Sequence, residues 1–193
     1  MWWCPVSEVP LASPISHASF CDIEIMVSDL TDGVIFLRPL HFVDAVDHLA
    51  GEDDEIARWL SGGRSTLATV EDYINSCEEH WRSNGPRRAF GIFHCSTNRL
   101  IGSIEANLAY QSIPGQVNIS YGVFLNWRGK GVVQRALDLV GSYLKRSTEL
   151  RQMVVRIAPE NTASLRVAEK AGFQCLGIFD EPNGRMVRYA RDL

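Results

Sequence analysis

The chain lacks the features that mark membrane, disulfide-rich and nucleic-acid-binding proteins. None of its apolar runs approaches the ~20 residues that a helix needs to span a bilayer. The five cysteines are scattered, with no CxxC pair and no His at zinc-finger spacing, so we expect free thiols and no metal site. The formal net charge of -4 is not the basic excess that a nucleic-acid-binding protein usually carries.

Basic residues are missing from the N-terminal part of the chain. Residues 1–37 contain no Lys or Arg, so they lack the positively charged start of a secretory signal. We expect a cytoplasmic protein with no membrane partner. Residues 1–30 show no periodic apolar pattern, which predicts a poorly ordered extension before a single domain over residues 31–193.

Several catalytic and nucleotide-binding motifs are also missing. The chain contains no GxxxxGK[ST], GxSxG or HExxH, so P-loop and common hydrolase chemistry have no support. A glycine-rich turn is present at residues 128–131, but it lacks the third glycine and the early strand–helix–strand context of a dinucleotide fold.

Apolar periodicity and turn residues predict an α/β domain around a mixed sheet. Helices are expected within residues 41–60 and over residues 70–81, 133–144 and 161–171; strands are expected at residues 33–37, 87–95, 100–110, 117–125, 153–157, 173–179 and 185–190.

The glycine-rich turn is the most informative segment. An apolar run from Tyr121 to Leu125 leads into Arg128-Gly-Lys-Gly131, and an amphipathic helix follows at once. Free backbone N–H groups and the helix dipole make such a helix N-terminus attractive to anions. The segment predicts a site for a pyrophosphate-bearing ligand, the alternative being an ordinary surface connection between a strand and a helix.

Two segments resemble the GNAT family of acyl-CoA-dependent N-acetyltransferases. Residues 128–133, Arg-Gly-Lys-Gly-Val-Val, are similar to the R/Q-x-x-G-x-G/A acetyl-CoA loop but depart from it at Val133. Residues 161–173, Asn-Thr-Ala-Ser-Leu-Arg-Val-Ala-Glu-Lys-Ala-Gly-Phe, resemble the N-x-x-S-x-R-V-x-E-K-x-G-F segment of ribosomal-protein and drug acetyltransferases. The resemblance implies a mostly antiparallel sheet flanked by helices, acetyl-CoA as co-substrate and no metal.

The resemblance also implies where acetyl-CoA binds. The loop would hold the pyrophosphate, and the pantetheine arm would lie along the preceding strand, where a backbone N–H near Val123 could stabilise the oxyanion. Asn161 either caps its helix or contacts the pantetheine. The cofactor-binding residues expected on this basis are Val123, Phe124, Leu125, Arg128, Gly129, Lys130, Gly131, Val132, Val133 and Asn161.

The catalytic residues are less evident. Many relatives carry a tyrosine that protonates the leaving thiolate, but Ala168 stands at that position. Ser164, one turn earlier, becomes the candidate proton donor, unless it is an ordinary polar helix residue. Glu105 is the candidate general base, acting through a water, unless it simply faces solvent; Tyr121 and His94 are weaker candidates.

The acceptor is inferred from charge alone. The acidic residues Glu52 to Glu55 lie where the family builds its acceptor site, and they would attract a cationic amine if they are not just an exposed loop. We expect an acetyltransferase acting on a small cationic amine, with an aminoglycoside as first candidate, in a monomer or homodimer. A protein N-terminal acetyltransferase and a non-catalytic coenzyme A binder are the alternatives.

Overall fold

The computed structural model describes residues 30–109, 113–182 and 184–193. Its order of elements is the one that the sequence predicts. The elements are β1 (Ile35–Pro39), η1 (Phe42–Asp44), α2 (Ala45–Ala50), α3 (Asp54–Ile56), η2 (Ala57–Ser61), α4 (Leu67–Arg82), β2 (Arg87–His94), β3 (Arg99–Asn107), β4 (Gln116–Val123), η3 (Leu125–Trp127), α5 (Val132–Ser147), β5 (Gln152–Ile157), α6 (Thr162–Lys170), β6 (Gln174–Glu181) and β7 (Gly184–Asp192).

The strands form one sheet in the order β1-β2-β3-β4-β5-β7-β6. Every neighbouring pair is antiparallel except β4 and β5. That pair is parallel because α5 connects the two strands, as a crossover helix does. The expected α/β class, with a mixed and mostly antiparallel sheet, is confirmed.

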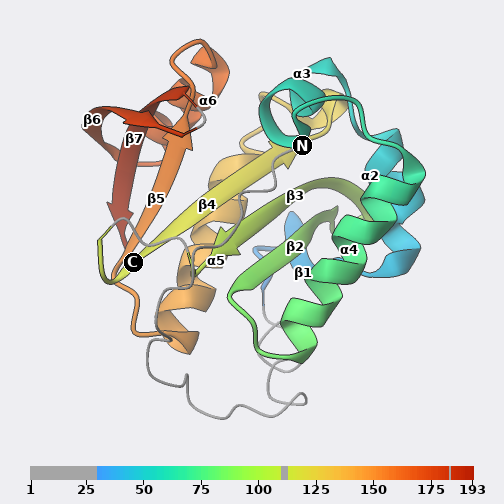
Figure 1. The fold of residues 1–193 in the computed structure, drawn as a ribbon. Coiled ribbons are helices and arrows are strands. Elements are labelled where there is room, and N and C mark those ends of the chain that lie inside the picture. Colours follow the sequence, from blue (N-terminus) through green and yellow to red (C-terminus); the bar gives the residue numbers. More distant parts are fainter. Residues whose placement is uncertain (1–29, 110–112, 183) are drawn as a thin grey trace.

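Helices cover both faces of the sheet. Figure 1 shows α5 behind it, whereas α4 lies on the opposite side, over β1 and β2, with α2 packed beside α4 and against β3. Each helix turns its apolar stripe toward the strands, at the spacing that the sequence predicts. The buried residues of α4 are Val70, Ile74, Cys77 and Trp81; those of α5 include Val132, Ala136, Leu137, Val140 and Leu144.

Trp81 anchors the end of α4 to the sheet. Its indole Nε1 donates a hydrogen bond of 2.9 Å to the carbonyl oxygen of Ala89 on β2. Its ring packs edge-on against Phe90, and Phe90 packs in the same way against Tyr143 of α5. A buried aromatic cluster therefore joins helices from both layers through one strand, with the polar indole N–H satisfied.

Several predicted boundaries move. The strand expected to reach Leu125 ends at Val123, because the chain turns there into η3 and exposes the Leu125 side chain. The first strand begins at Ile35, since Gly33 adopts a positive φ of 83° in the preceding turn. The predicted end of the third strand at Tyr110 and the N-terminal extension lie outside the described residues, except for residue 30 itself.

In the described part of the chain, no helix combines the length and apolarity needed to cross a membrane. The same residues contain no group of three or more His, Cys, Asp or Glu side chains placed to hold a metal ion.

Leu137 offers a direct test of the packing between α5 and the sheet. Its side chain is 0% exposed, so Leu137→Ala should lower the free energy of unfolding by about 2–5 kcal/mol through lost burial and the cavity left behind. Urea denaturation measures the change. Ser142→Ala, on the exposed side of the same helix, should change stability by less than about 0.5 kcal/mol. Equal effects of the two substitutions would contradict the described packing.

Candidate functional site

The sheet opens between β4 and β5. These strands pair only from Gln116 to Asn118 on β4 and from Gln152 to Val154 on β5. Beyond that point β4 continues for five residues to Val123 beside β3 alone, and Figure 1 shows the two strands diverging. The second half of β4 therefore has backbone groups without a neighbouring strand on one side.

The free edge of β4 faces this gap. The N–H of Phe124, just past the strand, donates to the carbonyl oxygen of Ile101 on β3 at 2.9 Å. Successive residues of an extended chain direct their backbone groups to opposite sides. The backbone groups of Tyr121 and the N–H of Val123 therefore point away from β3 and into the gap, where an extended ligand can pair with them as a strand does. The Val123 carbonyl oxygen is already bonded to Arg128.

Arg128 ties the loop after β4 to α3, which lies near the end of β4 (Figure 1). Its Nε donates to the carbonyl oxygen of Val123 at 2.9 Å, and its guanidinium pairs with the Asp53 carboxylate at 2.8 Å. Hydrogen bonding from Arg128 holds the pKa of Asp53 below its usual value. Asp53 also caps α3 by accepting from the N–H of Ile56 at 3.0 Å. One guanidinium thus fixes the loop to its own strand and to α3.

The turn from the loop into α5 has the form of an anion cradle. Gly129 and Gly131 have φ values of 72° and 75°, which side chains with a Cβ rarely adopt. No atom lies within 4 Å of the place where a Cβ on Gly129 would stand. The cap residue of α5 is Gly131, which has no side chain to satisfy the first-turn N–H groups. The residues present therefore fit a phosphate group at this helix N-terminus.

Lys130 and Trp127 border the cradle. The Lys130 ammonium lies 5.2 Å from the centre of the Trp127 ring, and no carboxylate among the described residues pairs with this lysine. The other face of the loop meets His94, whose ring centre lies 4.6 Å from that of Trp127. Because His94 also bonds to Thr97 at 3.1 Å, it supports the loop and does not face the free edge of β4.

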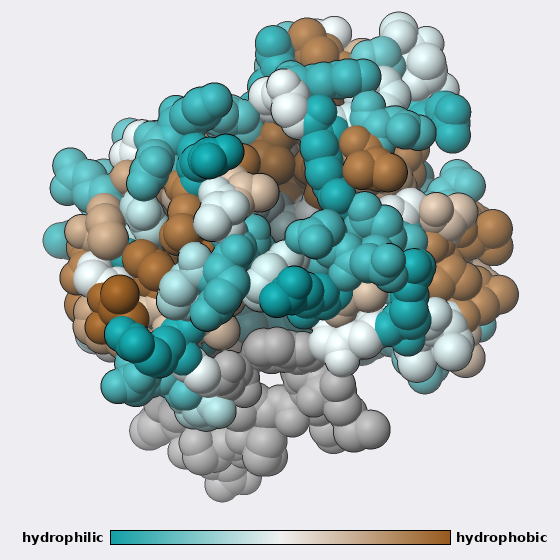
Figure 2. All heavy atoms as spheres, turned by 90° about the horizontal axis from the view of Figure 1, so that it is seen from above, coloured by the Kyte–Doolittle hydropathy of each residue, from teal (hydrophilic) through white to brown (hydrophobic). Residues whose placement is uncertain are grey.

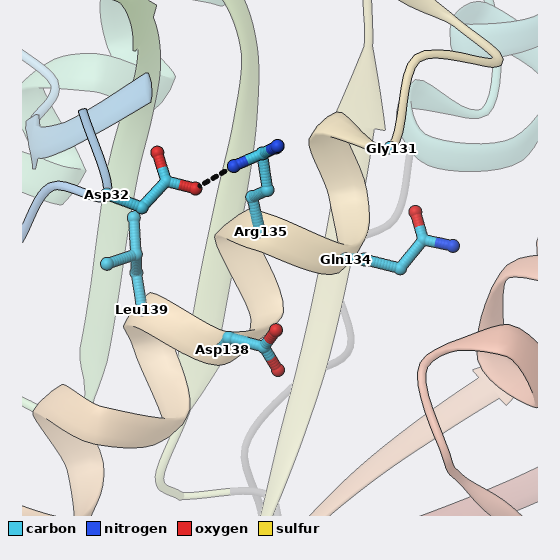
Figure 3. Close-up of a pocket in the computed structure, with 6 residues that line it drawn as sticks. All are labelled: Asp32, Gly131, Gln134, Arg135, Asp138 and Leu139. Atoms are coloured by element: carbon cyan, nitrogen blue, oxygen red, sulfur yellow. Dashed lines mark hydrogen bonds and ion pairs between the residues drawn. The ribbon is translucent and has the colours of Figure 1, made fainter. Parts of the chain in front are cut away.

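A surface pocket of about 450 Å³ follows α5 from the cradle outward. Gly131, Gln134, Asp138 and Leu139 line it along the helix, and Figure 3 shows Arg135 reaching across to Asp32. The two ions of that pair are 2.6 Å apart. Since Asp32 already neutralises Arg135, the pocket adds no unpaired cation to the cradle, and the positive potential there comes from Lys130 and the helix N-terminus.

Two of the predicted cofactor-binding residues, Val132 and Val133, begin α5 and pack against the core. Val132 is buried and Val133 is half-buried against the core. The Val133 side chain is therefore directed at least partly toward protein. Phe124 packs toward α2, where a Cβ on Gly51 would clash with its ring. Its backbone is also engaged, because its N–H donates to the carbonyl oxygen of Ile101 and its own carbonyl oxygen accepts from the N–H of Trp127 at 2.8 Å.

Ser164 lies next to Tyr121, across the gap. The Ser164 hydroxyl donates to the Tyr121 hydroxyl at 3.0 Å, which joins α6 to β4. Asn161 caps α6 by accepting from the N–H of Ser164 at 3.1 Å. The capping function considered for Asn161 is confirmed, and it holds Ser164 at the start of the helix. Ala168 is buried in the core and supplies no polar group.

Glu105 lies on the opposite face of the sheet. Its register partner on β4 is Ser120, whereas Ile104 pairs with Tyr121, and neighbouring residues of a strand face opposite ways. The Oε2 atom of Glu105 accepts from Arg87 at 2.8 Å and from Tyr73 at 3.2 Å. No described residue bonds to Oε1. Ser164 and Glu105 therefore approach β4 from its two faces and are not in contact.

Burial shifts the pKa values of three side chains on the α2 and α4 side of the sheet. Burial raises the pKa of Tyr73 well above its usual value and that of the Cys77 thiol to about 12. Burial lowers the pKa of His48 on α2, which favours its neutral form.

The acidic segment from Glu52 to Glu55 divides into two parts. Glu52 turns inward and accepts bonds from Ser61 and Ser65 at 2.6–3.0 Å, and Asp53 is bound to Arg128. The Asp54 side chain is 90% exposed despite its ion pair with Arg64, and Glu55 is exposed as well. Two of the four carboxylates are therefore structural, and two remain on the surface.

Comparison with known proteins identifies the family of this fold. Residues 35–174 match the family model described as an acetyltransferase (GNAT) domain. The chain belongs to the GNAT acetyltransferase family. It is 30% identical over 160 residues to a probable N-acetyltransferase, YjcK, of Bacillus subtilis strain 168, covering 75% of this chain and 82% of that protein. The expected acyl-CoA-dependent N-acetyltransferase class, with acetyl-CoA as co-substrate, is confirmed at this level.

Solved structures of other GNAT proteins share the fold. An acetyltransferase of Salmonella typhimurium, described as modifying the N-terminal serine of ribosomal protein L7/L12, has a TM-score of 0.73 at 17% identity, with 85% of this chain and 97% of that chain covered. The aminoglycoside acetyltransferase AAC(6')-Ib with coenzyme A has a TM-score of 0.70 at 21% identity, covering 82% and 94%. At such identities the likeness concerns the fold and leaves the acceptor open.

The sequence alone does not connect Tyr121 with Ser164 or Arg128 with Asp53. The two members of each pair are 43 and 75 residues apart in the chain, so no local pattern links them. Arg87 and Tyr73, which hold Glu105, also come from other elements. The one available signal was the polar Tyr121 within the apolar end of a strand that leads to the GNAT loop.

Substitution of Arg128 tests the tie between the loop and α3. Arg128→Ala should weaken coenzyme A binding by about 5- to 20-fold, or about 1–2 kcal/mol, because both hydrogen bonds that fix the loop are lost. Asp53→Asn should weaken it less, since an asparagine still caps α3 and only the ion pair is lost. Isothermal titration calorimetry gives both affinities.

Asp180→Asn is the matched control, because Asp180 is 92% exposed on β6, away from the loop, and its loss should leave the affinity unchanged. Wild-type affinity of Arg128→Ala would remove Arg128 from the site. Tighter binding by Asp53→Asn would show that Arg128 acts as a free charge and not as a tie.

Proposed function

We propose that this GNAT domain acetylates a primary amine in the gap between β4 and β5, and that the acceptor is a small cationic amine, with an aminoglycoside as first candidate. The observation that carries the proposal is the placement of candidate groups on both faces of β4 beside an anion cradle. Amine acetylation needs a base that takes a proton from the amine and an acid that gives a proton to the leaving thiolate. The acid and the base must be kept apart, so that the acid does not protonate the base.

The cradle and the free strand edge support the donor side. Gly129, Gly131 and the α5 N-terminus suit the pyrophosphate, with Lys130 as an added cation. The outward backbone groups of Tyr121 and Val123 suit the amide-bearing pantetheine arm. An N–H directed into the gap at Val123 is also placed to stabilise a developing oxyanion. Acetyl-CoA bound there supplies the thioester; the chain supplies orientation and polar groups.

Glu105 supports the acceptor side. Its Oε2 atom is fixed by Arg87 and Tyr73, so the carboxylate has a defined orientation, while Oε1 is left to hold a water or the amine. A positioned carboxylate is a suitable general base, directly or through one water. Because Glu105 lies on the face of the sheet opposite Ser164, the amine can reach the thioester from one side while the sulfur leaves on the other.

Charge and surface polarity favour a cationic acceptor. Asp54 and Glu55 remain exposed beside the end of β4, and an exposed ion pair such as Asp54–Arg64 is weak enough for another cation to compete. Figure 2 views the molecule from the end toward which β4 and β5 diverge, and hydrophilic side chains cover much of that surface. A hydrophilic amine suits this entrance better than an apolar one.

A protein N-terminus is the second candidate acceptor. Residues 161–173 resemble the corresponding segment of ribosomal-protein acetyltransferases, and one solved structure with the same fold is described as modifying an N-terminal serine. A peptide also presents a primary amine, so the same groups on β4 would serve it. The two acceptors differ in charge, which the acidic surface residues can reveal.

The rate of free-thiol release from acetyl-CoA in the presence of different amines identifies the acceptor class. Wild-type protein with acetyl-CoA should release free thiol fastest with an aminoglycoside, more slowly with polyamines, and least with N-terminal peptides. Asp54→Asn should raise KM for the cationic acceptor by about 2- to 5-fold, in line with the loss of up to about 1 kcal/mol of surface charge interaction. Asp180→Asn should leave KM unchanged.

Faster turnover with N-terminal peptides would replace the first candidate by the second. Binding of acetyl-CoA without turnover on any amine would leave a non-catalytic coenzyme A binder and contradict the proposed reaction.

A further inference from the structure

Within the described residues, the bond between Tyr121 and Ser164 is the one hydrogen bond that joins a side chain of β4 to a side chain of α6. Tyr121 lies three residues beyond Asn118, the last β4 residue paired with β5. The bond therefore crosses the opening at the point where β4 and β5 have separated, next to the free edge of β4. This side-chain pair takes no part in strand pairing, which favours a role in the site.

The pair is held from both ends. The Tyr121 ring packs against the core beneath α5, and Ser164 is fixed through its own N–H by the Asn161 cap. The hydroxyl–hydroxyl distance is 3.0 Å, with Ser164 as donor. Since the serine proton is directed at the tyrosine oxygen, the tyrosine proton is left for another acceptor; the nearest one, the carbonyl oxygen of Ser164, is 3.5 Å away.

The protonation state favours Tyr121 as a donor and not as a base. Burial raises the pKa of Tyr121, and the hydrogen bond from Ser164 opposes this rise only in part. The phenol thus keeps its proton at neutral pH. Of the two hydroxyl groups the phenol is also the stronger acid, because an aliphatic hydroxyl does not ionise in the range where tyrosine does.

We propose that Tyr121 and Ser164 act as one unit, in which the Tyr121 hydroxyl protonates the leaving sulfur and Ser164 positions that hydroxyl. This inference rests on the proposed function. It assigns the proton donor to a strand residue, since Ala168, which stands where many relatives carry a tyrosine on this helix, is buried and has no polar group. Ser164, the first candidate from the sequence, becomes a positioning residue.

The amine nitrogen bonds to the acetyl carbon, and the carbon–sulfur bond breaks with its electron pair going to sulfur. Tyr121 Oη gives its proton to that sulfur, while the proton lost by the amine nitrogen leaves through the base on the acceptor face. The phenolate then regains a proton from solvent along the Ser164 hydroxyl, and Ser164 is reprotonated in turn.

Tyr121→Phe separates this role from packing, because it removes only the hydroxyl. We expect kcat for amine acetylation to fall about 100-fold, at the lower end of the loss of a general acid, with KM for acetyl-CoA little changed. Ser164→Ala should lower kcat in the same direction. Because the two residues act as a unit, the double variant should be no slower than the slower single variant.

Tyr189→Phe is the matched control. Tyr189 also donates its hydroxyl to α6, at Glu169 and 3.2 Å, but it lies on β7 and not at the gap. This variant should keep the wild-type kcat. An equal fall in Tyr189→Phe would show that loosening of α6, and not proton donation, explains the result, and it would overturn the proposal.

A binding measurement tests the contact without turnover. Wild-type protein should bind coenzyme A about 5-fold more tightly than desulfo-coenzyme A, which lacks the sulfur, because a hydroxyl donates to that atom. Tyr121→Phe should lose this preference while binding desulfo-coenzyme A as wild type does, which also shows that the variant is folded. Calorimetry with both ligands decides this.

Different results would overturn the proposed function and the proposed proton-donating pair. Wild-type protein that acetylates no amine overturns the proposed function. Wild-type turnover together with an unchanged kcat in Tyr121→Phe overturns the proton-donating unit alone, as does a preference for coenzyme A over desulfo-coenzyme A that survives in Tyr121→Phe.

Discussion

The early end of pairing between β4 and β5 is the constraint on which the rest of the site depends. Two parallel strands that separate after three residue pairs leave one strand edge without partners inside a folded domain. Backbone N–H and C=O groups in such a place need partners, from solvent or from a ligand. A ligand with its own amides, lying extended along β4, satisfies them. The gap is thus a break in the pairing of the sheet and, in the proposed function, the binding surface.

The surrounding elements are arranged to hold that gap open and charged. The α5 helix begins at one end of it with an uncapped N-terminus, Arg128 ties the loop to α3 through Asp53, and α6 faces β4 through Ser164. The Tyr121–Ser164 hydrogen bond joins β4 to α6 across the opening, and the Arg128–Asp53 ion pair fixes the loop at the end of β4. A rigid frame around an open edge keeps the geometry of the site without burying it.

The sequence predicts most of the fold and the cofactor loop. Local signals suffice for these: the helical periodicity of Val70 to Trp81, the glycine turn before α5, and the Asn161 cap all act within a few residues. The end of β4 was predicted two residues too late, because Phe124 and Leu125 are as apolar as a strand requires. What decides that boundary is the turn into η3, which packs Phe124 toward α2.

The sequence suggests which groups could be catalytic, but it does not predict how they are arranged in space. Glu105 acquires its orientation from Arg87 and Tyr73, and Tyr121 acquires its partner from α6. Such contacts depend on which face of the sheet each residue occupies and on how far β4 continues past β5. Exposed Asp54 and structural Asp53 show the same limit, since adjacent acidic residues have unlike roles that composition does not distinguish.

Amide hydrogen exchange along β4 tests the central claim, that the free edge of this strand is the binding surface, most directly. Coenzyme A should slow exchange at the amides of Tyr121 and Val123, which point into the gap, and leave Phe124 nearly unchanged because its N–H already bonds to Ile101. Protection confined to the N-terminus of α5, with Tyr121 and Val123 exchanging as in the free protein, would contradict the account.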